Sequence, residues 1–136
     1  VEFKFGADWG FSNDPTVLLR MFMRDNCLYI DHEFYGVGIE ITELERAFET
    51  VPGSRKWHIT ADSERPDTKS YMRNKGFAID GAKKGKGSVA DGIEFLRGFE
   101  KIVIHPRCKA AISNFMNYKW KQDKITQEVL RVPCFS

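Results

Sequence analysis

The feature that most constrains the fold of this chain is a change in its hydrophobic periodicity near residue 40. Before that point, three runs rich in strand-forming residues follow one another, at residues 1–10, 16–24 and 27–35. The first gap is closed by the turn-forming run of residues 12–15 and the second by Asp25-Asn26 alone. Consecutive strands joined by short turns form an antiparallel meander, so we expect three antiparallel strands at the start of the chain.

After residue 40, apolar residues recur at helical spacing. Residues 41–51 predict an amphipathic helix, with Thr42 as the N-cap and Glu45 at capping-box spacing. Further on, the pattern alternates between strand and helix. It predicts strands at residues 57–62, 77–81 and 101–105, helices at 66–74, 89–100 and 107–118, and a hairpin at 118–131.

This element order predicts an α/β fold. Right-handed crossovers make the later strands parallel to the first, so the sheet is mixed: three antiparallel strands, then parallel strands, with helices on both faces. The same order of elements is found in RNase H-like domains. With 136 residues, of which 42% are hydrophobic and 29% charged, we expect residues 1–136 to form a single folded domain rather than a disordered chain.

Charge and cysteine content exclude several classes of protein. The net charge of +2 does not by itself indicate a nucleic-acid partner, although lysines cluster near residues 83–86 and 119–124. The three cysteines are an odd number without C-x-x-C spacing, which favours reduced thiols over a disulfide framework or a zinc site. No apolar run approaches the length of a membrane span, and no signal peptide is recognisable, so we expect a soluble intracellular protein.

Two aspartates are the best candidates for catalysis. Asp8 follows the first predicted strand, and Asp62 ends the fourth. If these strands are parallel neighbours, both carboxylates lie at one edge of the sheet, where their mutual repulsion is relieved by Mg²⁺ or Mn²⁺. Two such ions can support attack of water on a phosphodiester. Each aspartate taken alone is more often a turn residue; the pairing within this element order favours a metal site.

The run GAKKGKGS at residues 81–88 superficially has the composition of a P-loop, but Gly87 separates Lys86 from Ser88, so ATP binding is not expected. We interpret it instead as a basic loop in which Lys83, Lys84 and Lys86 contact DNA phosphates, the alternative being a plain solvated loop. The three histidines lack metal-ligand spacing and are expected to be structural. Among them, His105, which precedes Pro106-Arg107, is the first candidate for a DNA contact.

Several linked motifs resemble one known family. The similarity spans nearly the whole chain and lies in GADWGFSNDPT at residues 6–16, ADSERP at 61–66, AKKGKGSV with DGI at 82–93, and IHPRC at 104–108. These motifs resemble, in the same order, the nuclease half of phage terminase large subunits of the PBSX type. The resemblance implies an RNase H-like metal-dependent endonuclease that cuts concatemeric double-stranded DNA in the host cytoplasm. It also implies that Asp8 and Asp62 bind two catalytic Mg²⁺ or Mn²⁺ ions and that Arg65 joins the lysines in binding DNA.

The resemblance further implies partners: an N-terminal ATPase motor domain, a portal protein and a small terminase subunit. In one respect the sequence departs from the family, which carries a third acidic metal ligand on a helix after the hairpin. No residue up to Ser136 matches that ligand. Two alternatives therefore stay open. One is a truncated or degenerate module that binds DNA or a portal protein without cutting, and the other is a different RNase H-like nuclease such as a Holliday-junction resolvase.

Overall fold

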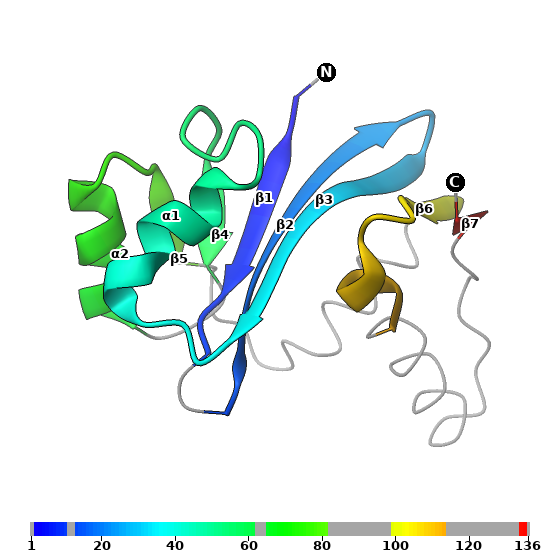
Figure 1. Ribbon diagram of the computed structural model, residues 1–136. Helices are drawn as coiled ribbons and strands as arrows, with labels where there is room; N and C mark the ends of the chain where they lie inside the picture. Colours follow the sequence, from blue (N-terminus) through cyan, green and yellow to red (C-terminus); the bar gives the residue numbers. More distant parts are fainter. Residues whose placement is uncertain (1, 11–12, 62–64, 82–98, 114–133, 136) are drawn as a thin grey trace, which may run out of the picture.

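The computed structural model describes residues 2–10, 13–61, 65–81, 99–113 and 134–135. Its strands form one mixed sheet in the order β5-β4-β1-β2-β3-β6-β7 (Figure 1). The bounds are β1 Lys4–Asp8, β2 Pro15–Arg24, β3 Cys27–Val37, β4 Ile59–Ala61, β5 Ile79–Gly81, β6 Lys101–Ile104 and β7 Cys134–Phe135. The neighbouring pairs β1–β2 and β2–β3 are antiparallel, and β1–β4, β4–β5, β3–β6 and β6–β7 are parallel. The predicted mixed sheet is confirmed.

The meander at the start of the chain is built as expected. Asp25 and Asn26 have φ angles of 51° and 65°, the left-handed conformation that a two-residue hairpin turn requires and that Asp and Asn tolerate. Strand β3 continues two residues beyond the predicted end, to Val37. Its pairing with β2 is irregular between Arg20 and Met21, which pair with His32 and Ile30, so that Asp31 lies at a bulge.

The first predicted helix is shorter than expected. A 3₁₀ turn, Ile41–Glu43, leads into α1, Leu44–Glu49. The predicted N-cap at Thr42 is wrong. Glu40 occupies that position, and its backbone N–H donates to Glu43 Oε1 at 3.2 Å. The spacing of a capping box is preserved but is displaced by two residues, because the 3₁₀ turn takes up the residues where the α-helix was expected to begin.

The second helix, α2, spans Pro66–Asn74 as predicted, with proline in its first turn. Strands β4 and β5 are shorter than predicted and run parallel to each other beyond β1. Residues 109–113 are helical, which agrees with part of the predicted helix at 107–118. The rest of that helix, most of the helix at 89–100 and the hairpin at 118–131 lie outside the described residues. Strand β7 was not predicted.

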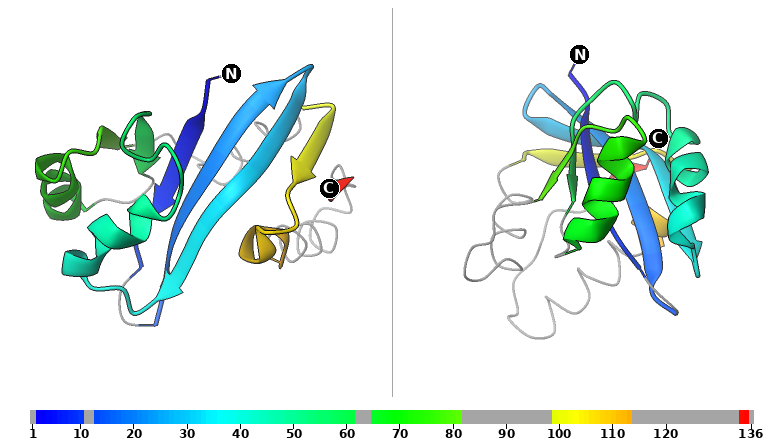
Figure 2. Two further views of the ribbon diagram at one scale, coloured as in Figure 1. Left: turned by 45° about the horizontal axis from the view of Figure 1, so that its top comes forward. Right: turned by 90° about the vertical axis from the view of Figure 1, so that its left-hand side faces the viewer.

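Two apolar clusters lie on opposite faces of the sheet, because neighbouring residues of a strand point to opposite sides. Leu18 belongs to the larger cluster, which α1 and α2 cover with residues such as Phe48 and Met72. The next residue, Leu19, packs against the smaller cluster, to which residues of the 109–113 helix add Ala111 and Ile112. Figure 2 shows β2 and β3 as a long twisted ribbon between the α1–α2 side and β6.

Phe48 is the side chain that joins most of the larger cluster. It is fully buried, its ring stacks on Trp9 at 5.4 Å between centroids, and it meets the edge of Phe77 at 6.0 Å. We predict that Phe48→Ala lowers the free energy of unfolding by about 3–5 kcal/mol, because the truncation leaves a cavity between helix and sheet. Urea denaturation measures the change. As a control, Tyr35→Ala removes a ring that is 44% exposed and should cost about 1 kcal/mol or less. Equal costs for the two variants would contradict this account of the core.

Candidate active site

The carboxyl ends of three parallel strands lie side by side. In the registers of β1 with β4 and of β4 with β5, Ala7 is the partner of Ala61, and Ala61 is the partner of Gly81. Asp8, the last residue of β1, is therefore one residue beyond this row. The residue that follows Ala61 in the sequence is Asp62, and the predicted basic loop follows Gly81. The parallel neighbours on which the two-aspartate prediction depended are present.

The structure tests the predicted site residues only in part. Asp8 is exposed at the end of β1, where its carboxylate is available to solvent. Arg65 is exposed at the N-cap of α2, and its backbone carbonyl accepts a hydrogen bond from Lys69 N–H at 3.1 Å. Asp62, Lys83, Lys84 and Lys86 lie outside the described residues, so their predicted roles stay predictions.

Asp8 is held in place by its buried neighbours. Ala7 before it and Trp9 after it are 4% and 7% exposed, and Trp9 is stacked on Phe48. The next residue, Gly10, donates its N–H to Thr16 Oγ1 at 2.9 Å, and the Thr16 hydroxyl donates back to the Gly10 carbonyl at 3.3 Å. Thr16 is itself buried. The chain on both sides of Asp8 is thus fixed, while its side chain is exposed.

Gly10 is required by close packing of the backbone. A Cβ atom added there would lie 2.2 Å from the carbonyl oxygen of Asp14 and 2.3 Å from the carbonyl of Pro15. The sequence suggested that small residues near Asp8 allow a metal ion to approach. For Gly10 the structure supplies a different reason, which is the return of the chain into β2. At Gly6, a Cβ would meet only the Met21 side chain, at 3.5 Å.

A second polar network clamps the edge of the sheet formed by β4 and β5. Asp80 on β5 contacts His58 Nε2 at 2.6 Å and accepts a hydrogen bond from Arg73 of α2 at 3.2 Å. The hydrogen bond with His58, and then the charges of His58 and Arg73, lower the pKa of the Asp80 carboxyl, while desolvation opposes them. These residues tie β5 to α2 and to the start of β4, so we assign them a structural role that the sequence did not reveal.

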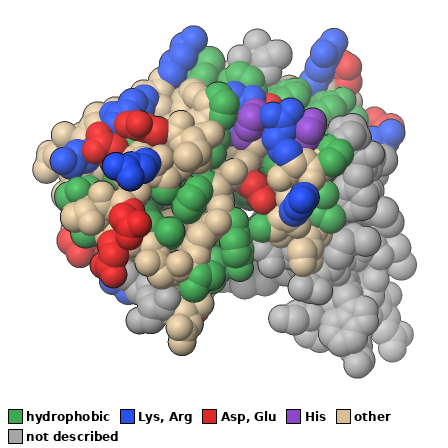
Figure 3. Space-filling model, in the orientation of Figure 1, with side chains coloured by type: hydrophobic (Ala, Val, Ile, Leu, Met, Phe, Trp, Pro, Cys, Tyr) green, Lys and Arg blue, Asp and Glu red, His purple; other side chains and the backbone are tan. Residues whose placement is uncertain are grey.

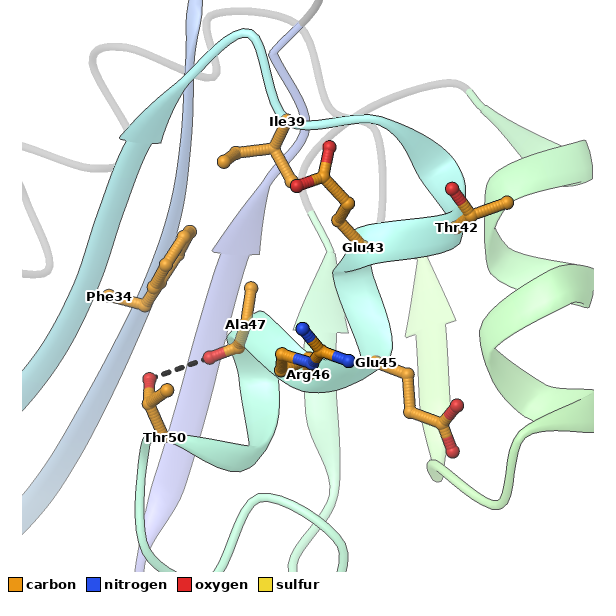
Figure 4. Close-up of a pocket in the computed structure, with 8 residues that line it drawn as sticks. All are labelled: Phe34, Ile39, Thr42, Glu43, Glu45, Arg46, Ala47 and Thr50. Atoms are coloured by element: carbon orange, nitrogen blue, oxygen red, sulfur yellow. Dashed lines mark hydrogen bonds between the residues drawn. The ribbon is translucent and has the colours of Figure 1, made fainter.

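Two grooves in the described part of the chain contain neither Asp8 nor Arg65. The larger, of about 430 Å³, lies between the end of β3 and α1 and is lined on one side by Phe34 and Ile39 and on the other by α1 residues (Figure 4). There, the Thr50 hydroxyl donates to the Ala47 carbonyl at 2.6 Å. The smaller, of about 280 Å³, lies at the opposite, amino-terminal ends of β1 and β4.

The chemistry of Asp8 suits a hard divalent cation. A carboxylate oxygen is the ligand that Mg²⁺ and Mn²⁺ prefer, and the exposed strand end leaves room for further oxygen ligands. Within the ranges that the structure describes, no group of three or more His, Cys, Asp or Glu side chains is placed to hold a metal ion. A complete metal site would therefore require Asp62 or other carboxylates outside those ranges.

Comparison with known proteins identifies the family of the chain. Residues 8–132 match the family described as "Terminase RNAseH like domain". The chain belongs to this family. Its sequence is 29% identical over 128 residues to the PBSX phage terminase large subunit of Bacillus subtilis (strain 168), and the match covers 90% of this chain. It spans only 28% of that subunit.

Solved structures agree. The nuclease domain of the large terminase g2p from bacteriophage SPP1, determined with bound Mn, matches with a TM-score of 0.76 and 25% identity, covering 86% of this chain and 68% of that chain. The nuclease domain of the P22 large terminase matches with a TM-score of 0.67 and 16% identity, covering 85% and 66% respectively. The large terminase of a thermophilic bacteriophage gives 0.64 and 18%, covering 84% and 30%. The resemblance and the RNase H-like fold expected from the sequence are confirmed.

No helix in the described part of the chain is long and apolar enough to cross a membrane.

The two glycines flanking Asp8 provide a matched test of the site. We predict that Gly10→Ala destabilises the protein by about 1–3 kcal/mol, because its Cβ meets backbone that cannot move aside. Gly6→Ala, whose Cβ meets only the end of Met21, should be neutral or stabilising by up to about 1 kcal/mol. Urea denaturation of both variants measures the difference. A Gly10→Ala variant as stable as Gly6→Ala would show that the β1–β2 connection is not packed as described.

Proposed function

We propose that this chain is the metal-dependent endonuclease domain of a phage terminase large subunit, which cuts concatemeric double-stranded DNA during genome packaging in the host cytoplasm. The observation that supports it most is the parallel register that sets the end of β4 beside Ala7, immediately before Asp8. In a chain of the terminase RNase H-like family, this arrangement brings the residue before Asp62 next to the residue before Asp8.

In this proposal Asp8 and Asp62 hold Mg²⁺ or Mn²⁺, two ions in the complete site. When bound, the metal supplies a polarised water and positive charge beside the phosphodiester. Asp8 is suited to this role because Trp9, Gly10 and Thr16 fix the chain around it, so that the carboxylate loses little freedom when it takes up a ligand. The manganese in the SPP1 nuclease domain structure supports a divalent metal here.

The proposal assigns DNA binding to basic side chains near the strand ends. Arg65 lies exposed at the start of α2, directly after the segment that contains Asp62. Lys83, Lys84 and Lys86 follow β5 in the sequence, and β5 lies beside β4. These cations would contact the phosphates on either side of the cut. An ATPase motor domain, a portal protein and a small terminase subunit are the partners we propose for the whole subunit.

Cleavage of supercoiled plasmid in the presence of Mn²⁺ tests the function. We expect Asp8→Asn and Asp62→Asn each to reduce nicking by more than about 100-fold, because each variant removes a charged metal ligand. Excess EDTA should abolish nicking by the unmodified chain. The matched control is Asp25→Asn, at a turn whose carboxylate is 88% exposed and whose left-handed backbone tolerates asparagine. It should cut like the unmodified chain.

Calorimetric titration of Mn²⁺ provides a readout that does not depend on cutting. Weaker Mn²⁺ binding by Asp8→Asn than by Asp25→Asn supports the assignment of the ligand. Undiminished nicking in Asp8→Asn would contradict the proposal, and a preference for RNA–DNA hybrids over duplex DNA would contradict the assignment to packaging. DNA binding that weakens steeply with salt, without any Mn²⁺-dependent nicking, would favour the alternative of a binding module that does not cut.

A further inference from the structure

A cluster of donor groups lies where β3 passes the turn after β6. Arg107 Nη1 lies 3.0 Å from His32 Nε2, and Arg107 N and Nε donate to His105 Nδ1 at 3.1 and 2.9 Å. A further contact of 3.0 Å joins Arg107 Nη2 and His105 Nε2. Figure 3 shows two histidines on either side of a basic side chain, on the face turned toward the viewer. We call these three side chains the 32–105–107 cluster.

The cluster has more hydrogen-bond donors than acceptors. A guanidinium carries five N–H donors and no acceptor, and a neutral imidazole offers one acceptor nitrogen and one N–H. Arg107 faces both ring nitrogens of His105, so one of these contacts sets an imidazole N–H against a guanidinium N–H. Two imidazoles supply at most two acceptors to the Arg107 side chain. The remaining N–H groups require an acceptor from outside the cluster.

The acidic side chains nearby are engaged elsewhere. Asp31 accepts two hydrogen bonds from Arg20, at 3.0 and 2.5 Å. The two carboxylate oxygens of Glu33 accept the backbone N–H groups of Ala110 and Ala111, at 3.0 and 2.8 Å, at the start of the 109–113 helix. Among the described residues, Arg107 forms no salt bridge with a carboxylate. The positive charge of the cluster is therefore not neutralised by its neighbours.

We propose that the 32–105–107 cluster is a phosphate-binding site that takes a phosphate group of the DNA backbone. A tetrahedral oxyanion presents several acceptor oxygens and a negative charge, which are what the cluster lacks, and the fork of a guanidinium matches phosphate geometry. A divalent cation fits less well, because Arg107 lies against the nitrogens that would coordinate it. Free phosphate has the same chemistry, so the experiment below separates the two sources.

The cluster is separate from the proposed cutting site. His32 pairs with Arg20 in the middle of β2, whereas Asp8 pairs with Val17 close to the start of that strand. A phosphate bound here would give DNA a second point of attachment, away from the strand ends that carry Asp8. Only the identification of the phosphate as DNA rests on the proposed function; the site itself rests on the geometry of the three side chains.

The charges around His32 allow binding to be detected without any substitution. Partial desolvation, followed by the charges of Arg20 and Arg107, lowers the pKa of His32, with Asp31 acting in the opposite direction and His105 adding to the lowering. A bound phosphate opposes the effect of the two arginines and favours the imidazolium. We therefore expect phosphate to raise the pKa of His32. His58, which is paired with Asp80 of β5, serves as the internal control.

The first measurement is an NMR titration of the imidazole signals of the full chain against pH, with and without inorganic phosphate at matched ionic strength. Sodium chloride replaces phosphate in the reference. We expect a saturable increase in the pKa of His32, a response of His105, and none of His58. Equal responses of all three histidines, or a response that does not saturate, would show general screening and would overturn the site.

The second measurement is duplex DNA binding in EDTA over a range of salt concentrations. We expect Arg107→Ala to weaken binding several-fold and to reduce the slope of log affinity against log salt by about one, the loss of one phosphate contact. Arg107→Lys should restore part of the affinity, since it keeps the charge without the fork. The matched control is Arg24→Ala, whose side chain is 70% exposed beside the β2–β3 turn and which should bind like the unmodified chain.

The combined outcomes separate this inference from the proposed function. Phosphate-dependent shifts in His32 together with a reduced salt slope in Arg107→Ala support the site even if Asp8→Asn shows that the chain does not cut. Phosphate-dependent shifts with an unchanged salt slope would assign the cluster to free phosphate and overturn its role in DNA binding. If inorganic phosphate shifts neither His32 nor His105, the proposal is wrong whether or not Arg107→Ala folds, because that measurement uses the unmodified protein.

Discussion

The pairing of β1 with neighbours on both sides determines the rest of the structure. Every residue of this strand is aligned with one in β2, and three of its five residues are also aligned with β4. Phe5 and Ala7 are buried in the larger cluster, and this burial fixes which residues of β1 face away from it. Because a shift of one residue would exchange the two faces of the strand, core packing and the exposure of Asp8 depend on the same register.

The same register explains why the candidate site can be built from residues far apart in the sequence. Asp8 and Ala61 are separated by β2, β3 and α1, yet β1 and β4 place their strand ends next to each other. The helices contribute mainly by covering one face: Phe48 of α1 stacks on Trp9, the residue after Asp8. A change in the core that moved Trp9 would therefore be transmitted directly to the carboxylate.

Much of this fold could be predicted from local sequence, because periodicity and turn residues report on single elements. Asp25-Asn26 indicated its tight turn without any knowledge of the remaining chain. The errors lie where distant contacts decide. The start of α1 was misplaced because a 3₁₀ turn capped by Glu40 precedes it. Strand β7 has only two residues, Cys134 and Phe135, and exists by pairing with β6, so no local pattern could reveal it.

The candidate site follows the same division. The sequence could indicate Asp8 and Asp62, because strand ends and motifs are local features, and the structure adds the parallel neighbours that the pairing of these residues needs. It could not indicate that Gly10 packs against the backbone of Asp14 and Pro15, since that contact depends on how the chain returns into β2. Nor could it unite His32 with Arg107, which lie 75 residues apart.

Local neutralisation, rather than net charge, decides where such a protein can bind an anion. A net charge of +2 suggests little affinity for DNA. However, several acidic groups are engaged within the fold: Glu45 and Glu49 by Arg55, Asp80 by Arg73 and His58, and Asp31 by Arg20. Glu33 is held by the backbone of the 109–113 helix. Each of these acids balances a specific partner, so that it does little to neutralise a cation further away. Arg107 is left beside two imidazoles, and the electrostatic field that a phosphate would meet there is set by that arrangement rather than by the overall count of charges.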